Sequence, residues 1–96
     1  MALGLGTATL DFGPMPGSAM TSVAVTGQTT ISATSAAEAY IMADTTVDHT
    51  DGNHRVIGGY TQLVCDPPTA GTGFTITAIS NLRLTGTITC RWVWSD

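Results

Sequence analysis

The sequence predicts an all-β fold, a small antiparallel β-sandwich or jelly-roll-like barrel in which residues 1–96 form one domain. Eighteen of the 96 residues are threonine, and the repeated valine and isoleucine beside them complete a composition typical of strands. Apolar and polar residues alternate strictly over residues 82–95, as they do in a strand with one buried face. Six or seven such segments, separated by glycine, proline and asparagine turns, indicate a sandwich or small barrel.

The N-terminal part of the chain is expected to be an extended arm followed by two strands. Residues 1–8 form the arm, and residues 7–13 form a first strand that stops at the turn-rich PMPGS sequence. Residues 21–32 alternate in polarity and form a second strand. Its inward-facing side chains are those of Val23, Val25 and Ile31.

A short apolar stretch at residues 37–44 is expected to be the next strand. The alternative is a helix over residues 32–43, capped by Ser35 with Glu38 as its capping-box partner. The flanking threonines and the short length favour the strand.

Three further strands are expected in the C-terminal half. Residues 54–66 form a strand that is broken by a bulge at Gly58-Gly59 and ended by Pro67-Pro68. Residues 74–80 and 82–95 form an antiparallel hairpin through the turn at Ser80-Asn81. The inward positions of this hairpin are expected to be Phe74, Ile76, Ala78, Ile88, Cys90, Trp92 and Trp94, with Gly86 at a bulge.

Composition excludes two classes of partner. The chain has no lysine, three arginines and a net charge of −4, so it lacks the basic surface with which proteins bind nucleic acid or anionic membranes. No apolar run approaches the ~20 residues of a membrane span. The N-terminus lacks the basic and apolar regions of a signal peptide. Cys65 and Cys90 match no zinc motif and are expected to be half-buried thiols, a disulfide being the alternative.

The most polar stretch is VDHTDGNHRV at residues 47–56, which holds both histidines of the chain. Asp-Gly and Gly-Asn dipeptides favour a solvated hairpin tip. Two alternatives are a metal site, for which the ligands of a zinc or EF-hand calcium site are incomplete, and a histidine pair that contacts a partner. The candidate residues for partner recognition are His49, Asp51, Asn53 and His54.

No catalytic, cofactor-binding or metal-binding residue is assigned, and the chain is not expected to be an enzyme. The sequence lacks a Gly-x-Ser-x-Gly elbow, and Glu38 is its sole glutamate. GTGFT at residues 71–75 lacks the lysine and helix of a phosphate loop. Trp92 and Trp94 could stack on sugar rings, but the alternation favours a place in the core.

The expected surface is typical of an interface instead. A polar but uncharged ladder of threonines is expected on one outward face, comprising Thr75, Thr77, Thr85, Thr87 and Thr89. The N-terminal arm could add a strand to a neighbouring molecule. The candidate interface residues are Met1, Leu3, Leu5, Leu10, Phe12, Pro14 and Pro16.

Five segments carry a resemblance to a known class of proteins: TLDFG at 9–13, SVAVTGQT at 22–29, DHTDGNHRV at 48–56, GTGFTI at 71–76 and the terminal WVWS. In this order they resemble small β-sandwich structural proteins encoded in the virion-gene regions of tailed bacteriophages. The resemblance covers most of the chain and brings no catalytic or metal-binding residues with it.

This resemblance implies a component of a virus particle that is made in the host cytoplasm. The expected function is a capsid decoration (cement) protein, a homotrimer that binds the major capsid protein and stabilises the lattice. The alternative is a tail-tip or tail-fibre module that recognises a host-surface glycan or protein, with Tyr60 or a tryptophan as a stacking platform beside the 48–54 loop.

Overall fold

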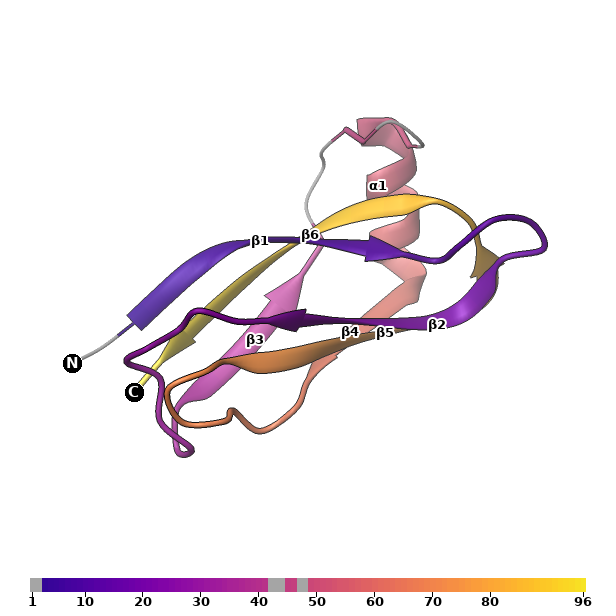
Figure 1. Cartoon of the computed structure of the whole chain (residues 1–96). Helices are drawn as coiled ribbons and strands as arrows, with labels where there is room; N and C mark the ends of the chain where they lie inside the picture. The colour runs from indigo at the N-terminus through magenta and orange to yellow at the C-terminus, as the bar shows by residue number, and fades with distance from the viewer. Residues whose placement is uncertain (1–2, 42–44, 47–48) are drawn as a thin grey trace.

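The computed structural model describes residues 3–41, 45–46 and 49–96, and it is a sandwich of two three-stranded antiparallel sheets with one helix (Figure 1). We call the sheet with strand order β1-β6-β3 sheet A and the sheet with order β2-β5-β4 sheet B. The elements are β1 (Leu3–Asp11), β2 (Ser18–Val25), β3 (Ala36–Tyr40), α1 (Asp51–Tyr60), β4 (Thr61–Cys65), β5 (Phe74–Leu84) and β6 (Thr87–Ser95). The all-β sandwich prediction is therefore confirmed.

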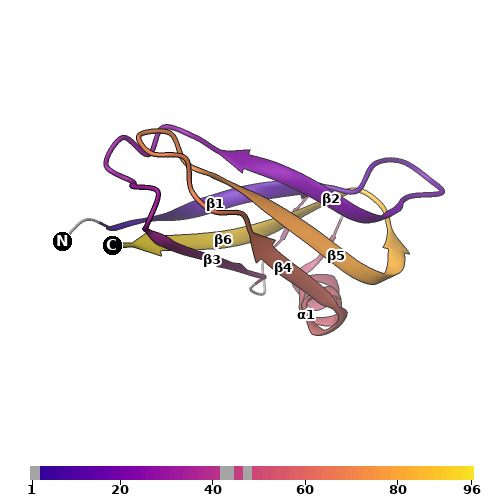
Figure 2. The ribbon, with the colours of Figure 1, turned by 90° about the horizontal axis from the view of Figure 1, so that it is seen from below.

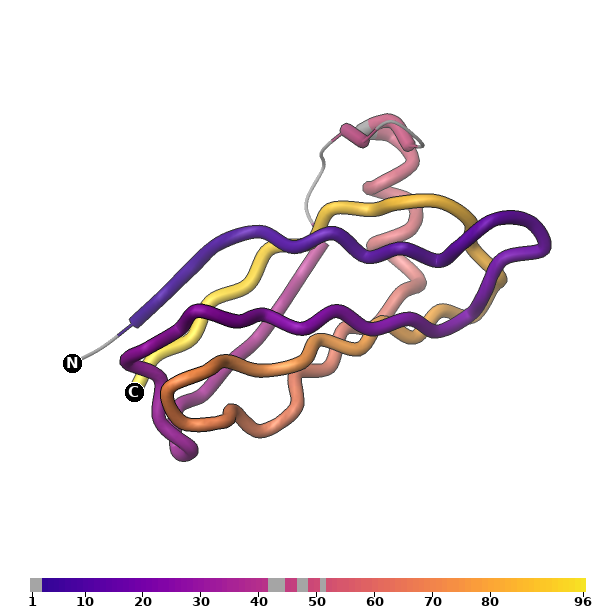
Figure 3. The backbone as a smooth tube through the Cα atoms, viewed as in Figure 1, coloured from indigo at the N-terminus to yellow at the C-terminus, as the bar shows by residue number. Residues whose placement is uncertain are grey.

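The two sheets lie face to face, and α1 lies in one of the connections that cross between them, from β3 to β4 (Figures 2 and 3). Side chains that alternate inward from both sheets make one core. Its buried apolar residues are Leu10, Phe12, Val25, Ile31, Ile57, Phe74, Ile76, Ala78, Leu84, Ile88, Cys90, Trp92 and Trp94. The inward positions expected for Val25 and both tryptophans are thus confirmed, and the ring of Trp92 packs edge-on against Phe74 at 5.7 Å. Ile31 is buried as expected, but it lies in the loop after β2, which ends at Val25 and not at residue 32.

The N-terminal segment is part of sheet A and does not form a separate arm over residues 3–8. β1 pairs with β6 along its whole length, from Leu3↔Ser95 to Asp11↔Thr87. Gly4 lies opposite Trp94 and Gly6 opposite Trp92. A Cβ atom at Gly6 would stand 2.6 Å from Cζ2 of Trp92, so the missing side chains make room for the indole rings over the strand. Gly4 and Gly6 therefore allow this segment to pack against the tryptophans.

The predicted hairpin between residues 74–80 and 82–95 is wrong. β5 runs through the expected turn to Leu84, and the chain then turns at residues 85–86, where Gly86 has φ 76°. β5 pairs with β2 and β4, whereas β6 pairs with β1 and β3. The two segments therefore lie in different sheets. The threonine ladder divides with them, because Thr75 and Thr77 belong to sheet B while Thr87 and Thr89 belong to sheet A.

The predicted strand over residues 54–66 is wrong for its first half. Residues 51–60 form α1, and only Thr61–Cys65 form a strand. The helix begins with a capping box, in which the Thr50 hydroxyl accepts from the Asn53 N–H and the Asn53 side chain accepts from the Thr50 N–H. Gly58-Gly59 lies in the last turn of this helix and is not a bulge. By contrast, the strand expected over residues 37–44 is confirmed for residues 37–40, which belong to β3, while residues 42–44 lie outside the described residues.

Candidate functional site

Polar residues before and at the start of α1 cover a part of the β6 edge that β3 does not reach. β3 ends at Tyr40, which pairs with Arg91, and among the described residues no strand pairs with β6 on this side before that point. Three side chains take the place of a strand there. The Thr89 N–H donates to Nε2 of His54 at 3.2 Å, the Thr46 hydroxyl donates to the Thr87 carbonyl at 2.7 Å, and Nε2 of His49 lies 2.6 Å from the Thr85 carbonyl.

His54 is a fully buried structural residue. Its Nε2 must be unprotonated because it accepts the Thr89 N–H, and the proton on Nδ1 is then donated to the Thr50 carbonyl at 2.9 Å. Both ring nitrogens are satisfied, and the side chain has 0% exposure. The ring of His49 packs edge-on against it, with 6.4 Å between centroids. His54 thus joins the helix to sheet A.

These contacts change the interpretation of the 47–56 stretch. The hairpin tip is wrong, since residues 51–60 are helical. Among the residues proposed for recognition, His54 is buried, Asn53 is exposed but belongs to the helix cap, and His49 is half-buried. The side chain of Asp51 lies outside the described residues, as does Asp48. Within the described ranges, no group of three or more histidine, cysteine or acidic side chains is placed to hold a metal ion.

A shallow hollow lies between α1 and the end of β5. Its volume is about 290 Å³, and its polar lining comes from His49, Asn53, Tyr60, Arg83 and Thr85. His49, Asn53 and the stacking candidate Tyr60 were proposed for recognition, so the structure brings these three to one place. Arg83, which sequence reasoning did not include, supplies a guanidinium group to the lining.

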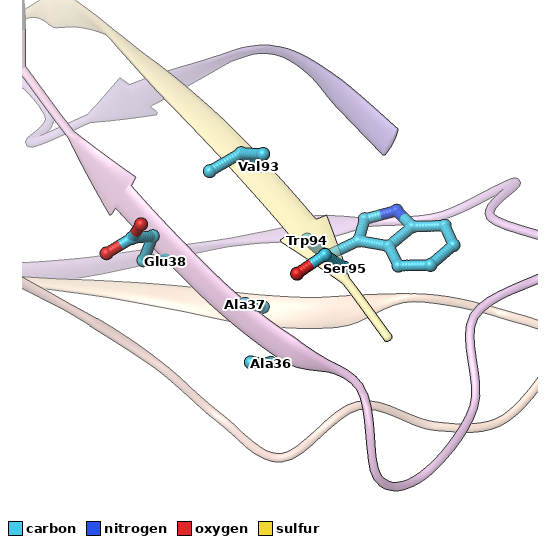
Figure 4. A pocket seen from close by; sticks show the side chains of 6 residues that line it. All are labelled: Ala36, Ala37, Glu38, Val93, Trp94 and Ser95. Carbon is cyan, nitrogen blue, oxygen red and sulfur yellow. The ribbon is translucent and has the colours of Figure 1, made fainter. Parts of the chain in front are cut away.

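A second hollow, of about 270 Å³, lies at the end of the β3–β6 pairing. Glu38 is the only ionisable residue of its lining, and its carboxylate and the indole of Trp94 point away from each other (Figure 4). Because its polar groups do not converge, this hollow offers no defined ligand geometry.

The outer face of sheet B carries no ionisable side chain in the part where β2, β5 and β4 lie side by side, whereas the exposed Arg83 lies beyond it near the end of β5. The outward residues are Met20, Ser22 and Ala24 on β2, Thr75, Thr77 and Ile79 on β5, and Gln62 and Val64 on β4. Met20 lies directly opposite Ile79, and Val64 lies opposite Thr77 beside them. Met20, Ile79 and Val64 are 61%, 45% and 42% exposed. This part of the sheet is therefore an apolar and hydroxyl-bearing surface, which we call the sheet B face.

The interface residues predicted in the N-terminal segment separate into two groups. Leu10 and Phe12 are in the core, with 0% and 3% exposure, so their assignment to an interface is wrong. Leu3 and Leu5 are exposed on β1. Pro14 and Pro16 are exposed in the β1–β2 turn. Met1 lies outside the described residues.

Cys65 and Cys90 are both free thiols, as the sequence predicted. Burial raises the pKa of Cys90 from its ordinary 9.0 to about 11. Burial also raises the pKa of Cys65, to which the charges of Glu38 and Asp66 add a smaller effect. Because the thiolate is the reactive form and a raised pKa keeps a thiol protonated, both side chains are unreactive at neutral pH.

We expect the stability of the fold to fall as the pH rises from about 9 toward about 11. Below this window both states keep the Cys90 proton; within it the unfolded chain loses the proton first, which favours unfolding. Urea unfolding at a series of pH values measures the effect. The Cys90→Ala variant should show a smaller fall than the parent, and an equal fall would contradict this origin.

No helix among the described residues is long and apolar enough to cross a membrane. No family model, curated protein or solved structure matches the chain.

Proposed function

We propose that the chain is a structural subunit of a virus particle, a decoration protein that binds the outside of a capsid lattice through the sheet B face. The observation that carries the proposal is the absence of ionisable side chains among the eight outward residues of that face, which include the exposed Met20, Val64 and Ile79. Interface cores are depleted in lysine, glutamate and aspartate in the same way. The resemblance to small virion proteins of tailed phages supplies the setting.

A sheet face suits repeated binding to a lattice. The backbone of the sheet B face is held by the β2–β5 and β4–β5 pairs, so the backbone loses little conformational freedom on binding. A stable interface buries about 800 Å² on each partner. The total surface of the chain is 5334 Å², so such an interface would take up about 15% of it, a share that one face of a sandwich can supply.

The test is the copy number of the chain in purified particles, relative to the major capsid protein, for the parent and for Ile79→Lys. We expect many copies for the parent and at least a tenfold loss of occupancy for Ile79→Lys, because the lysine would bury an unpaired charge at the contact. Thr30→Lys, in the exposed loop after β2, is the matched control and should bind like the parent. Parent-like occupancy of Ile79→Lys would exclude the sheet B face.

The hollow beside α1 favours the second candidate, a tail-associated module that recognises a host-surface glycan or protein. Tyr60 offers a ring for stacking, and Arg83 and Asn53 offer donors to a sugar carboxylate or hydroxyl. The same experiment separates the two functions. A handful of copies per particle, unaffected by Ile79→Lys, would favour the tail, and absence from the particle would defeat both.

A further inference from the structure

The free edge of β1 carries a row of unpaired backbone groups. In the β1–β6 ladder the even-numbered residues of β1 face β6, as the Phe12 N–H shows by donating to the Gly86 carbonyl at 2.9 Å. The odd-numbered residues Leu3, Leu5, Thr7 and Thr9 therefore direct their N–H and C=O groups away from β6. Within the described part of the chain these four residues have no backbone partner on that side. The next odd carbonyl, that of Asp11, accepts from the Thr21 hydroxyl at 2.8 Å.

This edge lacks the features with which soluble proteins prevent strand pairing. Such features are lysine, proline, bulges, inward-pointing charges and short length. β1 is nine residues long, and its residues 3–10 include no charged residue and no proline. The other edges are different: β3 and β4 have five residues each, and β2 has a register irregularity between Ser18 and Met20. β1 is thus the one long, regular and unblocked edge among the described strands.

We propose that β1 pairs antiparallel with β1 of a second copy of the chain, about a two-fold axis at Gly6. In this register Leu3 lies opposite Thr9 of the second copy, and Leu5 lies opposite Thr7 of the second copy. All four odd-numbered residues of each copy then form hydrogen-bonded pairs. A two-fold axis at Thr7 would instead place Leu3 opposite Asp11, whose carbonyl already accepts from the Thr21 hydroxyl. Sheet A becomes one six-stranded sheet across the two copies.

Charge and shape agree with a second copy as the occupant. The chain carries a net charge of −4, so two copies repel each other, and an uncharged contact surface is the kind that adds least to this repulsion. β1 is neutral up to Asp11, and the antiparallel arrangement places the two Asp11 residues at opposite ends of the pair. The pairing also covers part of Leu3 and Leu5, which are 58% and 73% exposed in the single chain. The cross-strand pairs are leucine with threonine, which fit a pleated surface.

The inference does not depend on a virus particle. It gives a two-fold contact, which differs from the trimer expected from the resemblance. Because one strand of each copy takes part, the interface lies at or below the usual ~800 Å² per partner, and we expect micromolar or weaker association. On a lattice, the high local concentration of bound copies would strengthen it.

Sedimentation equilibrium from low micromolar to near-millimolar concentration tests the pairing. We expect a monomer–dimer equilibrium for the parent and at least a tenfold weaker one for Thr7→Pro. Proline removes only the outward N–H of Thr7, which β6 does not use, so the β1–β6 ladder is kept. Thr7→Val, which keeps the N–H, is the matched control and should associate like the parent. Circular dichroism and tryptophan fluorescence check that Thr7→Pro is folded, and Thr7→Lys is a second blocked variant with an intact backbone.

Amide exchange followed by NMR gives a residue-level readout. In the dimer, the N–H groups of Leu3, Leu5, Thr7 and Thr9 should become protected as concentration rises, while those of Gly4, Gly6 and Ala8 are protected throughout. A parent that stays monomeric at every concentration, a folded Thr7→Pro that associates like the parent, or protection without this alternation would overturn the proposal.

Discussion

Replacing His54 with alanine should destabilise the fold by about 3 kcal/mol. The substitution leaves a cavity at a side chain with 0% exposure and removes the acceptor of the Thr89 N–H and the donor to the Thr50 carbonyl. For a domain of this size the loss corresponds to a fall in Tm of roughly 10–20 °C. Urea unfolding followed by tryptophan fluorescence measures the free energy directly.

Two further variants separate packing from hydrogen bonding at this position. His54→Phe fills the space but leaves the Thr89 N–H without its acceptor, while the Thr50 carbonyl keeps the bond from the backbone N–H of residue 54. It should therefore still cost about 1–3 kcal/mol. Val56→Ala lies on the exposed side of α1 and should change the stability by less than about 0.5 kcal/mol. If His54→Ala unfolded like Val56→Ala, the link between α1 and sheet A through His54 would be wrong.

Replacing Gly73 with alanine should cost about 3 kcal/mol or more. Gly73 has φ 156°, and a Cβ atom on its backbone would stand 1.8 Å from the carbonyl oxygen of Val25. That oxygen belongs to the strand that pairs with β5 at the neighbouring position, Val25↔Phe74. Backbone cannot rotate aside as a side chain can, so the β2–β5 ladder must shift at this end. The free energy of unfolding in urea reports the cost.

The control for Gly73 lies two residues away in the same loop. Gly71 also has a positive φ, of 74°, but a Cβ there meets nothing within 4 Å. Gly71→Ala should therefore carry only the cost of a left-handed backbone conformation, about 1–2 kcal/mol. Equal losses for the two variants would mean that the approach of Val25 does not limit the loop.

The sequence was sufficient for strands whose own side chains alternate between core and solvent. Ile88, Cys90, Trp92 and Trp94 lie on the buried face of β6, as the period of two predicts. It was not sufficient for the choice of strand partners. A hairpin and a crossover between sheets produce the same alternation, so the assignment of β5 and β6 to different sheets depends on tertiary packing.

In the segment that was wrongly predicted as a strand, the local composition does not favour a helix, and tertiary contacts determine the structure. DGNHRVIGGY contains three glycines and few strong helix formers, yet it is helical because Thr50 and Asn53 cap it and because His54 and Ile57 are buried. The Thr-x-x-Asn spacing at 50–53 is the one sequence signal that could have indicated the helix start. The structural role of His54 had no such signal, since its partner Thr89 lies 35 residues away.

The pairing of Leu3 with Ser95 brings the two ends of the described chain side by side, on neighbouring antiparallel strands at the same end of the molecule (Figure 1). This geometry determines how the domain responds to mechanical load. Hydrogen bonds between antiparallel strands lie across the strand direction. A force that separates residues 3 and 95 therefore loads the hydrogen bonds of the first residue pair alone and then those of the next, so that β1 and β6 separate one pair at a time. A load carried between one end and the opposite turn would instead strain many pairs at once, and the domain would resist it far better.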